Sequence, residues 1–177
     1  MYGAAMMADF RAKASPPAGL RPYLPADAAL LAEIFRASIT ELAAEDYSEA
    51  QQEAWVASAD DEAAFAARLA AELTLVATID GAPVGFAALG GGKEIDMLYI
   101  HPAVAGRGVG AMLCDAIEKL AAARGATKIS ADASDTALAF FQHRGFMAQR
   151  RNTVPKNGEW LSTTTVEKPL VATGSKQ

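Results

Sequence analysis

The first third of the chain places its apolar residues at helical spacing. Those within 31–42 recur every three or four positions after Asp27, which predicts a helix with Asp27 at its N-cap. The tetrapeptide 48–51, SEAQ, is a capping box that predicts a second helix running to about Ser58. A third helix is predicted for 60–73, begun by one of its two leading aspartates.

From residue 74 onward the apolar runs are short and rich in β-branched side chains, which is typical of strands. Segments 74–79 and 83–89 flank the dipeptide Asp80-Gly81, a pair that favours a tight hairpin turn. Another strand, 93–100, follows a turn at the glycines. These three strands are expected to form an antiparallel meander.

The second half of the chain alternates the two patterns. The predicted elements are a helix at 109–124, a strand at 127–131, a short helix from Ser134 or Asp135 to about His143, and strands at 146–154 and 160–168. The last two strands meet at Asn157-Gly158, another hairpin turn. This order predicts an α/β fold with a mixed, mostly antiparallel central sheet flanked by helices.

Composition narrows the class of protein. The 177 residues carry a formal charge of −5 and are about half apolar, which suits one globular domain, expected at 20–170 between a loose leader at 1–19 and a tail at 171–177. The negative charge argues against nucleic acid as a partner. No apolar run approaches the roughly 20 residues that span a bilayer, and the first residues lack the order of a signal peptide. We expect a cytoplasmic monomer or homodimer without a membrane partner.

Cysteine and histidine suggest little chemistry. The single cysteine, Cys114, falls on the apolar stripe of the predicted helix 109–124, where a buried core residue is expected. The two histidines, His101 and His143, lack the spacing of metal ligands, so no metal site is expected.

An alternating glycine run, AGRGVGAML at 105–113, opens one predicted helix. Glycines 106, 108 and 110 allow backbone N–H groups to approach a phosphate closely, and the positive end of the helix dipole favours the anion. Arg107 adds a cation between them. The run therefore predicts a phosphate-binding loop.

The same run also fits the dinucleotide fingerprint G-x-G-x-x-A, with Asp132 roughly 20 residues further on. That fingerprint needs its first glycine directly after a strand, whereas HPAVA separates Ile100 from Gly106. A P-loop is excluded because no Gly-Lys-Ser/Thr follows the run. An NAD-dependent oxidoreductase is the less favoured alternative.

The segment from Glu94 through Gly110, the AFFQHRGF segment at 139–146 and the order of elements resemble the GNAT superfamily of acetyl-CoA-dependent N-acetyltransferases. The family's pyrophosphate motif, Gln/Arg-x-x-Gly-x-Gly/Ala, falls on 105–110, where Ala105 replaces the polar first residue. The resemblance implies the acyl-CoA N-acyltransferase fold, with acetyl-CoA as the acetyl donor. The cofactor-binding residues that it implies are Leu98, Tyr99, Ile100, Ala105, Gly106, Arg107, Gly108, Val109, Gly110, Ala111, Ser134 and Phe141.

Two carboxylates are the candidate catalytic residues. The resemblance implies that Glu94 is the general base, and a carboxylate on a half-buried strand can have a raised pKa. Asp96, two positions along and expected on the same face, is the alternative. A purely solvated face that hides Ile95 and Met97 behind the two carboxylates is the other interpretation.

The resemblance also implies roles around the donor. The backbone at 98–100 would contact the pantetheine arm and polarise the acetyl carbonyl. The tyrosine that serves many members as general acid is replaced by Phe141, which leaves Ser134, Tyr99 and Tyr47 as candidate proton donors.

Charge is distributed unevenly along the chain. Residues 27–62 include ten acidic and one basic side chain, whereas 107–156 include eight basic and four acidic ones. By the resemblance, the first block walls the acceptor site, where negative charge would attract a cationic amine, and the second surrounds the donor. Tyr47, Trp55 and Trp160 are the expected substrate-binding residues.

We therefore expect an N-acetyltransferase that moves the acetyl group of acetyl-CoA to a primary amine on a small molecule, by direct attack on the thioester. Ala105 and Phe141 motivate an alternative, an acetyl-CoA-binding module with little or no turnover.

Overall fold

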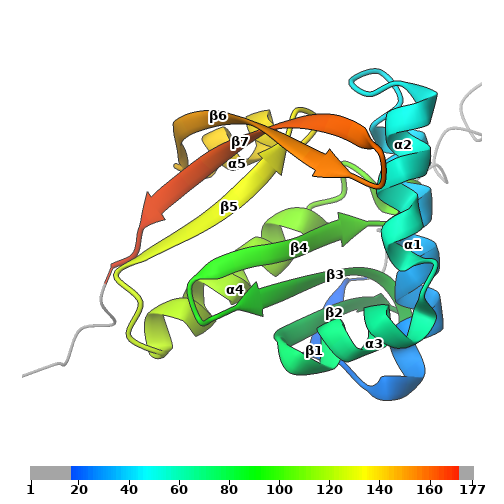
Figure 1. Cartoon of the computed structure of the whole chain (residues 1–177). Coiled ribbons are helices and arrows are strands. Elements are labelled where there is room, and N and C mark those ends of the chain that lie inside the picture. Colours follow the sequence, from blue (N-terminus) through cyan, green and yellow to red (C-terminus); the bar gives the residue numbers. More distant parts are fainter. Residues whose placement is uncertain (1–16, 172–177) are drawn as a thin grey trace, which may run out of the picture.

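In the computed structural model, residues 17–171 are described, and seven strands among them form one sheet with the order β1-β2-β3-β4-β5-β7-β6 (Figure 1). The strands are β1 (Gly19–Pro22), β2 (Leu73–Ile79), β3 (Ala82–Gly90), β4 (Glu94–Ile100), β5 (Lys128–Ser134), β6 (Met147–Lys156) and β7 (Glu159–Pro169). The helices are η1 (Pro25–Asp27), α1 (Ala28–Leu42), α2 (Glu49–Val56), η2 (Ala57–Ala59), α3 (Glu62–Ala71), η3 (Pro102–Val104), α4 (Val109–Ala123) and α5 (Leu138–His143). Neighbouring strands run antiparallel except β4 and β5, which are parallel. The predicted mixed, mostly antiparallel sheet flanked by helices is confirmed.

β4 and β5 separate soon after they begin to pair. Their register contains only Glu94 opposite Ser130 and Ile95 opposite Ala131. Beyond these pairs the two strands diverge toward their carboxyl ends, which opens the sheet (Figure 1). The backbone groups along the facing edges therefore need partners other than a neighbouring strand.

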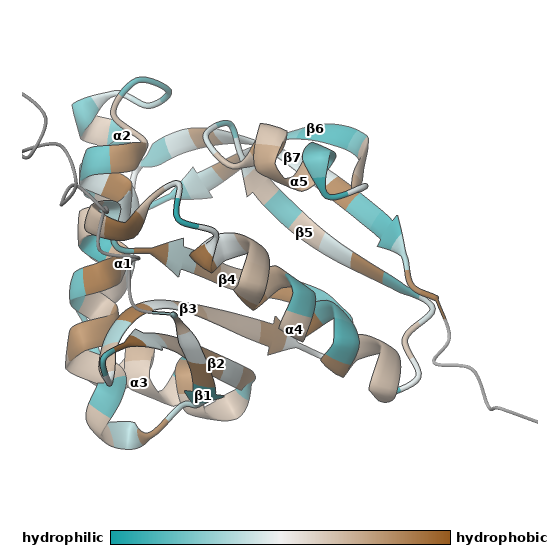
Figure 2. Ribbon diagram, turned by 180° about the vertical axis from the view of Figure 1, so that it is seen from behind, coloured by the Kyte–Doolittle hydropathy of each residue, from teal (hydrophilic) through white to brown (hydrophobic). Residues whose placement is uncertain are grey.

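Two apolar clusters pack against the opposite faces of the sheet. α4 contributes Leu113, Cys114 and Ile117 to one cluster, and Figure 2 shows this helix lying across β3 and β4. α1 and α3 cover the other face, with Phe35 and Phe65 among the buried residues. The expectation that Cys114 is a core residue is confirmed, since the side chain is fully buried and burial raises the pKa of its thiol to about 12.

Several predicted local motifs form as expected. The capping box is confirmed, because Gln51 N donates to Ser48 Oγ at 3.2 Å and Ser48 N donates to Gln51 Oε1 at 2.9 Å. Asp61 caps α3 by accepting from Ala64 N at 2.9 Å. The Asp80-Gly81 hairpin also forms, and both residues adopt positive φ angles, 51° and 79°, as a primed turn requires.

Other features differ from the sequence expectations. β1 was not predicted, because a four-residue segment with glycine and proline at its ends has no strand pattern and is defined by pairing with β2. α1 starts after Asp27 as predicted, but the Asp27 side chain does not cap it. This carboxylate instead accepts from Arg21 NH1 and NH2 at 2.7 and 2.8 Å, and from Leu24 N at 2.8 Å. β5 extends to Ser134, three residues beyond the predicted strand, which places Asp132 on it.

The expected leader at 1–19 lies outside the described residues up to residue 16, and the expected tail lies outside them from residue 172. Gly19, which was assigned to the leader, is the first residue of β1. Within 17–171 no helix combines the length and the apolar character needed to cross a bilayer.

Candidate active site

A cavity of about 500 Å³ lies where β4 and β5 diverge. Its lining comes from both sides of the sheet. Gly110, Phe140 and Phe141 belong to the α4 and α5 side, whereas Phe35 and Trp55 belong to the side covered by α1 and α2. One cavity therefore passes through the opening in the sheet and can hold two molecules that meet end to end.

The glycine loop precedes α4 and adjoins the cavity through Gly110, and its backbone leaves N–H groups exposed at the start of the helix. Gly106 and Gly108 adopt φ angles of 76° and 82°, a left-handed backbone that disfavours any residue with a Cβ. Gly108 is the N-cap of α4, and neither a side-chain cap nor an acidic residue occupies the first turn. The first N–H groups of a helix have no partner within it, so these amides are free for a phosphate.

The individual loop residues differ in what they can contribute. Ala105, Gly106, Arg107 and Gly108 are exposed, so the loop is accessible from solvent. Val109 is buried in the core, which leaves only its backbone amide for a ligand. Of the predicted cofactor-binding residues at 105–111, Gly110 belongs to the cavity lining and the others lie outside it.

The end of β4 lies beside the donor end of the cavity. Leu98, Tyr99 and Ile100 line the cavity, on the part of β4 that has left β5. The strand ends where His101 Nδ1 accepts from Ala103 N at 3.1 Å and caps the short helix η3. His101 therefore has a structural role in turning the chain toward the glycine loop.

The two carboxylates of β4 lie differently from the predicted alternation. A register shift between Ala88 and Leu89 of β3 makes Asp96 an extra residue in β4. Ile95 therefore packs in the cluster on the α4 side and Met97 in the cluster under α1 and α3. The expectation that one face hides both residues is wrong, because a bulge reverses the alternation of side chains after it.

Asp96 lines the cavity, whereas Glu94 lies outside its lining. Arg68 of α3 donates to Asp96 Oδ2 through Nε at 2.8 Å. Burial raises the pKa of Glu94, and the nearby negative charges of Asp96 and Asp132 raise it further. Glu94 thus retains a proton at higher pH than an ordinary glutamate, although its residue is exposed at the start of β4.

Two further carboxylates, Glu72 beside Asp96 and Asp132 in the cavity lining, were not among the expected catalytic residues. Glu72, at the end of α3, has a buried Oε2 atom without a hydrogen-bond partner among the described residues. Burial raises its pKa to about 7, and the negative charge of nearby Asp96 acts in the same direction. Asp132 of β5 lines the cavity. The alternation of Asp132 with two alanines in β5 was a usable signal, whereas nothing near Glu72 in the sequence indicated its neighbours.

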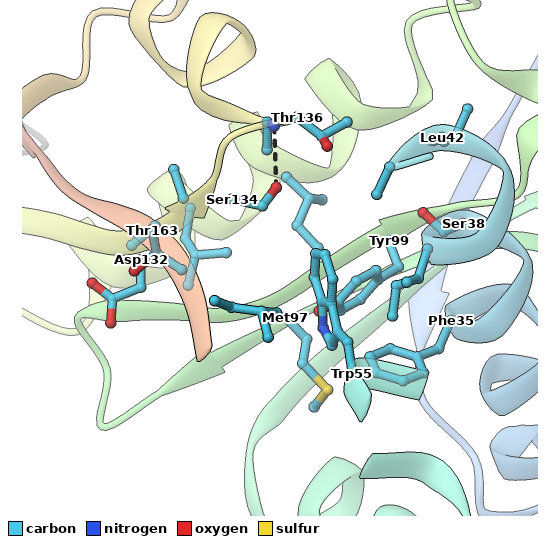
Figure 3. Close-up of a pocket in the computed structure, with 18 of the residues that line it drawn as sticks. Phe35, Ser38, Leu42, Trp55, Met97, Tyr99, Asp132, Ser134, Thr136 and Thr163 are labelled. Carbon is cyan, nitrogen blue, oxygen red and sulfur yellow. Dashed lines mark hydrogen bonds between the residues drawn. The ribbon is translucent and has the colours of Figure 1, made fainter. Parts of the chain in front are cut away.

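The position of the missing tyrosine is part of the core. Phe141 is 4% exposed, lines the cavity, and packs its ring against Phe146 with centroids 5.0 Å apart. Ser134 also lines the cavity, and its Oγ accepts from Ala137 N at 3.1 Å (Figure 3). The Ser134 proton remains available to a ligand.

The two candidate tyrosines are already hydrogen-bonded. Tyr47 OH donates to Ser162 O at 2.7 Å and accepts from Asp135 N at 2.8 Å, so its proton is engaged. Tyr99 OH accepts from Trp55 Nε1 at 3.3 Å, and burial raises the pKa of this phenol to about 12. Tyr99 therefore stays protonated at neutral pH and can donate a hydrogen bond into the cavity.

The cavity includes two of the three expected substrate-binding residues. Tyr47 and Trp55 both line it. Trp160 is 62% exposed and is not part of the lining, and it contacts the α2 layer through its carbonyl, which accepts from Gln51 Nε2 at 2.8 Å.

A mixed sheet that opens between two parallel strands, with a glycine loop at a helix start and a cavity at the opening, is the architecture of an acyl-CoA N-acyltransferase. Comparison with known proteins identifies the family. The family model for the acetyltransferase (GNAT) domain matches residues 43–167. An "Uncharacterized N-acetyltransferase YafP" of Escherichia coli (strain K12) is 33% identical over 143 residues, which are 81% of this chain and 90% of that protein.

Two solved structures illustrate the likeness. A protein of Rhodopseudomonas palustris, described as "GCN5-Related N-acetyltransferase: Aminotransferase, Class-II", is 62% identical, with 88% of this chain and 97% of that chain covered and a TM-score of 0.86. The PaiA N-acetyltransferase of Thermoplasma acidophilum, in complex with coenzyme A, shares the fold at 21% identity, with coverages of 86% and 99% and a TM-score of 0.72. The chain belongs to the GNAT acetyltransferase family and is an acyltransferase with acetyl-CoA as its donor.

Proposed function

We propose that this protein transfers the acetyl group of acetyl-CoA to a primary amine on a small molecule, by direct attack of the amine on the thioester. The observation that carries the proposal is the continuous cavity, which joins the glycine-loop side of the sheet to a second half lined by Asp96 and Asp132. The donor and the acceptor would enter from opposite faces and meet at the opening between β4 and β5.

The carboxylates attract the acceptor amine and take up its proton. An alkylamine has a pKa of about 10.4 and is almost entirely protonated at neutral pH. Asp96 and Asp132 attract this ammonium, and Glu94, with its raised pKa, takes the proton through water once the amine is bound. Arg68 holds Asp96 in place.

The donor end needs fewer groups. When bound, acetyl-CoA supplies an acetyl carbon that forms a bond to the amine nitrogen while the carbon–sulfur bond breaks, and the sulfur takes up a proton as the amine loses one. The backbone at Leu98–Ile100 and the glycine loop position the reacting end. A thiol has a pKa of about 8.5, so its thiolate leaves without an obligatory acid. Because Phe141 replaces the tyrosine, Tyr99 and Ser134 are the candidate proton donors to the departing sulfur.

A second candidate function is an acetyl-CoA-binding module without turnover. It is favoured by Phe141, whose buried ring cannot donate a proton, and by Ala105, which has no polar side chain for the pyrophosphate. This alternative predicts binding of acetyl-CoA and no loss of thioester with any amine.

Thermal unfolding of the purified protein tests both candidates when acetyl-CoA and, separately, NADH are titrated. A ligand at 100 times its Kd adds about 2.7 kcal/mol to the free energy of unfolding, which raises Tm by several degrees. We expect acetyl-CoA to stabilise the protein and NADH to leave it unchanged. Release of free coenzyme A in the presence of a panel of primary amines then separates the enzyme from the inactive module.

A further inference from the structure

The acceptor half of the cavity has an aromatic wall formed by Phe35, Tyr47, Trp55 and Tyr99. The rings of Tyr47 and Trp55 meet edge to face with centroids 5.4 Å apart, and those of Phe35 and Tyr99 do so at 4.7 Å. Trp55 joins the two pairs, since its ring lies 6.3 Å from that of Tyr99. Figure 3 shows Trp55, Tyr99 and Phe35 together on one side, with Asp132 and Thr163 on the other.

The polar atoms of this aromatic wall are directed at each other or at the backbone. Trp55 Nε1 donates to Tyr99 OH at 3.3 Å, and Tyr47 OH is bonded to Ser162 O and Asp135 N. The surface that the wall offers to a ligand is therefore mainly carbon. A polyhydroxylated ligand would lose its hydrogen bonds to water here without gaining replacements.

The cavity lining has few charged side chains, and only some of them form ion pairs. Asp96 and Asp132 lie on adjacent strands, β4 and β5. Arg68 is paired with Asp96, with N–O distances of 2.8 and 2.6 Å. Lys156, on the β6–β7 hairpin, also lines the cavity, and the described part of the chain provides it with no ion pair within 4.0 Å. A second ammonium on the ligand would meet this lysine in a poorly solvated space.

We infer that the acceptor is a primary monoamine with a flat, apolar body, such as an arylalkylamine. Its ammonium would be attracted by Asp96 and Asp132, and its ring would lie against Trp55 and the neighbouring aromatic side chains. Amino sugars are disfavoured because the aromatic wall offers a carbon surface to their hydroxyl groups. Polyamines are disfavoured because their second ammonium would meet the cation of Lys156. This inference rests on the proposed function, since it specifies the acceptor of the same site.

The test compares 2-phenylethylamine with putrescine and glucosamine at saturating acetyl-CoA, with release of coenzyme A as the readout. Burial of a ring against an aromatic wall is expected to raise kcat/KM about tenfold or more over the polar amines. Trp55→Ala is expected to remove most of this preference, because it deletes the ring that joins the two aromatic pairs. Trp160→Ala is the matched control, because that tryptophan is exposed and outside the cavity lining, and it should keep the preference.

A binding measurement separates failure of the inference from failure of the proposed function. In a Trp160→Phe background Trp55 is the remaining tryptophan, so its fluorescence reports on the acceptor half in the presence of coenzyme A. We expect 2-phenylethylamine to change this fluorescence saturably, at lower concentration than putrescine, whether or not it is acetylated. Equal or weaker binding than putrescine overturns the inference. Tight 2-phenylethylamine binding without acetylation of any amine supports the inference and instead contradicts the proposed transfer.

Discussion

Arg68 of α3 and Asp96 of β4 join two layers of the fold through a single carboxylate oxygen. Nε donates to Oδ2 at 2.8 Å, and NH2 lies 2.6 Å from the same atom. The Arg68 side chain is 47% exposed, so a pair of this kind contributes only about 0–1 kcal/mol to stability. Its main consequence is geometric, because it holds the bulge residue Asp96 at the cavity and distinguishes it from Glu94, whose pKa is raised.

The first prediction concerns these two carboxylates. Glu94→Gln should lower kcat by roughly 10²–10⁴-fold at neutral pH, the usual contribution of a general base. Because the Glu94 pKa is raised, the wild-type rate should increase with pH through that pKa, and this limb should disappear in the variant. The thermal shift produced by acetyl-CoA should be retained as a control. Wild-type rates in Glu94→Gln, together with a large loss in Asp96→Asn, would assign the base to Asp96.

The second prediction is a pH dependence of stability that comes from Glu72. Its pKa is raised from 4.5 to about 7, so the folded protein binds this proton more tightly than the unfolded chain does. The contribution of Glu72 to the free energy of unfolding is most favourable below the unfolded pKa of 4.5. This contribution is lost as the pH rises to about 7. Glu72→Gln should therefore be more stable relative to wild type at pH 8 than at pH 5. We expect a difference on the order of 1 kcal/mol, discounted for partial exposure.

Urea denaturation at pH 5 and pH 8 measures this difference. Glu33→Gln, at an exposed position of α1, is the control for the loss of one carboxylate and should show the same difference at both pH values. A Glu72→Gln curve that parallels that of Glu33→Gln would show that Glu72 ionises normally in the fold.

The third prediction uses the glycine loop. Gly108→Ala introduces a Cβ at a φ angle of 82°, which should cost about 1–2 kcal/mol in stability and distort the amides at the start of α4. Gly81→Ala, in the hairpin at a φ angle of 79°, carries the same backbone strain far along the chain from the loop. A Cβ meets no atom within 4 Å at either position, so the two variants differ mainly in their surroundings. Isothermal titration should show weaker acetyl-CoA binding for Gly108→Ala alone.

The fourth prediction concerns the missing tyrosine. Phe141→Tyr restores a phenol at a cavity position, and kcat should rise if protonation of the departing thiolate limits the rate. The buried hydroxyl should also lower stability by about 1–3 kcal/mol unless it finds a partner. Phe146→Tyr, at a buried ring that packs against Phe141 but lies outside the cavity lining, is the control. An unchanged kcat in a folded Phe141→Tyr protein would mean that another donor, or water, already protonates the sulfur fast enough.

The locally encoded features were the predictable ones. The Ser48 capping box, the Asp80-Gly81 turn and the glycine run at the start of α4 each depend on residues within five positions of one another. Their hydrogen bonds and φ angles follow from side-chain chemistry and steric limits, which hold wherever the segment lies. The fold class followed from their order, and the family from the glycine run and its neighbours.

The site's other features required the folded chain. The bulge at Asp96 depends on the register with β3, and it reverses the side-chain alternation that was used to place Ile95 and Met97. β1 becomes a strand only by pairing with β2. Trp160 is an expected substrate-binding residue, yet it is exposed and lies outside the cavity lining.

By itself, the sequence determined most of the helices and strands, the glycine run at the start of α4 and the presence of two carboxylates on β4, because these are set by interactions between near neighbours. Only the tertiary structure decided that Glu72 lies near enough to Asp96 for that charge to raise its pKa, and that four aromatic side chains from α1, α2, β4 and the loop at Tyr47 form one wall. Except for the Tyr47–Trp55 pair, those contacts join residues more than 20 positions apart. Their geometry depends on how the layers pack, and no periodicity along the chain records it.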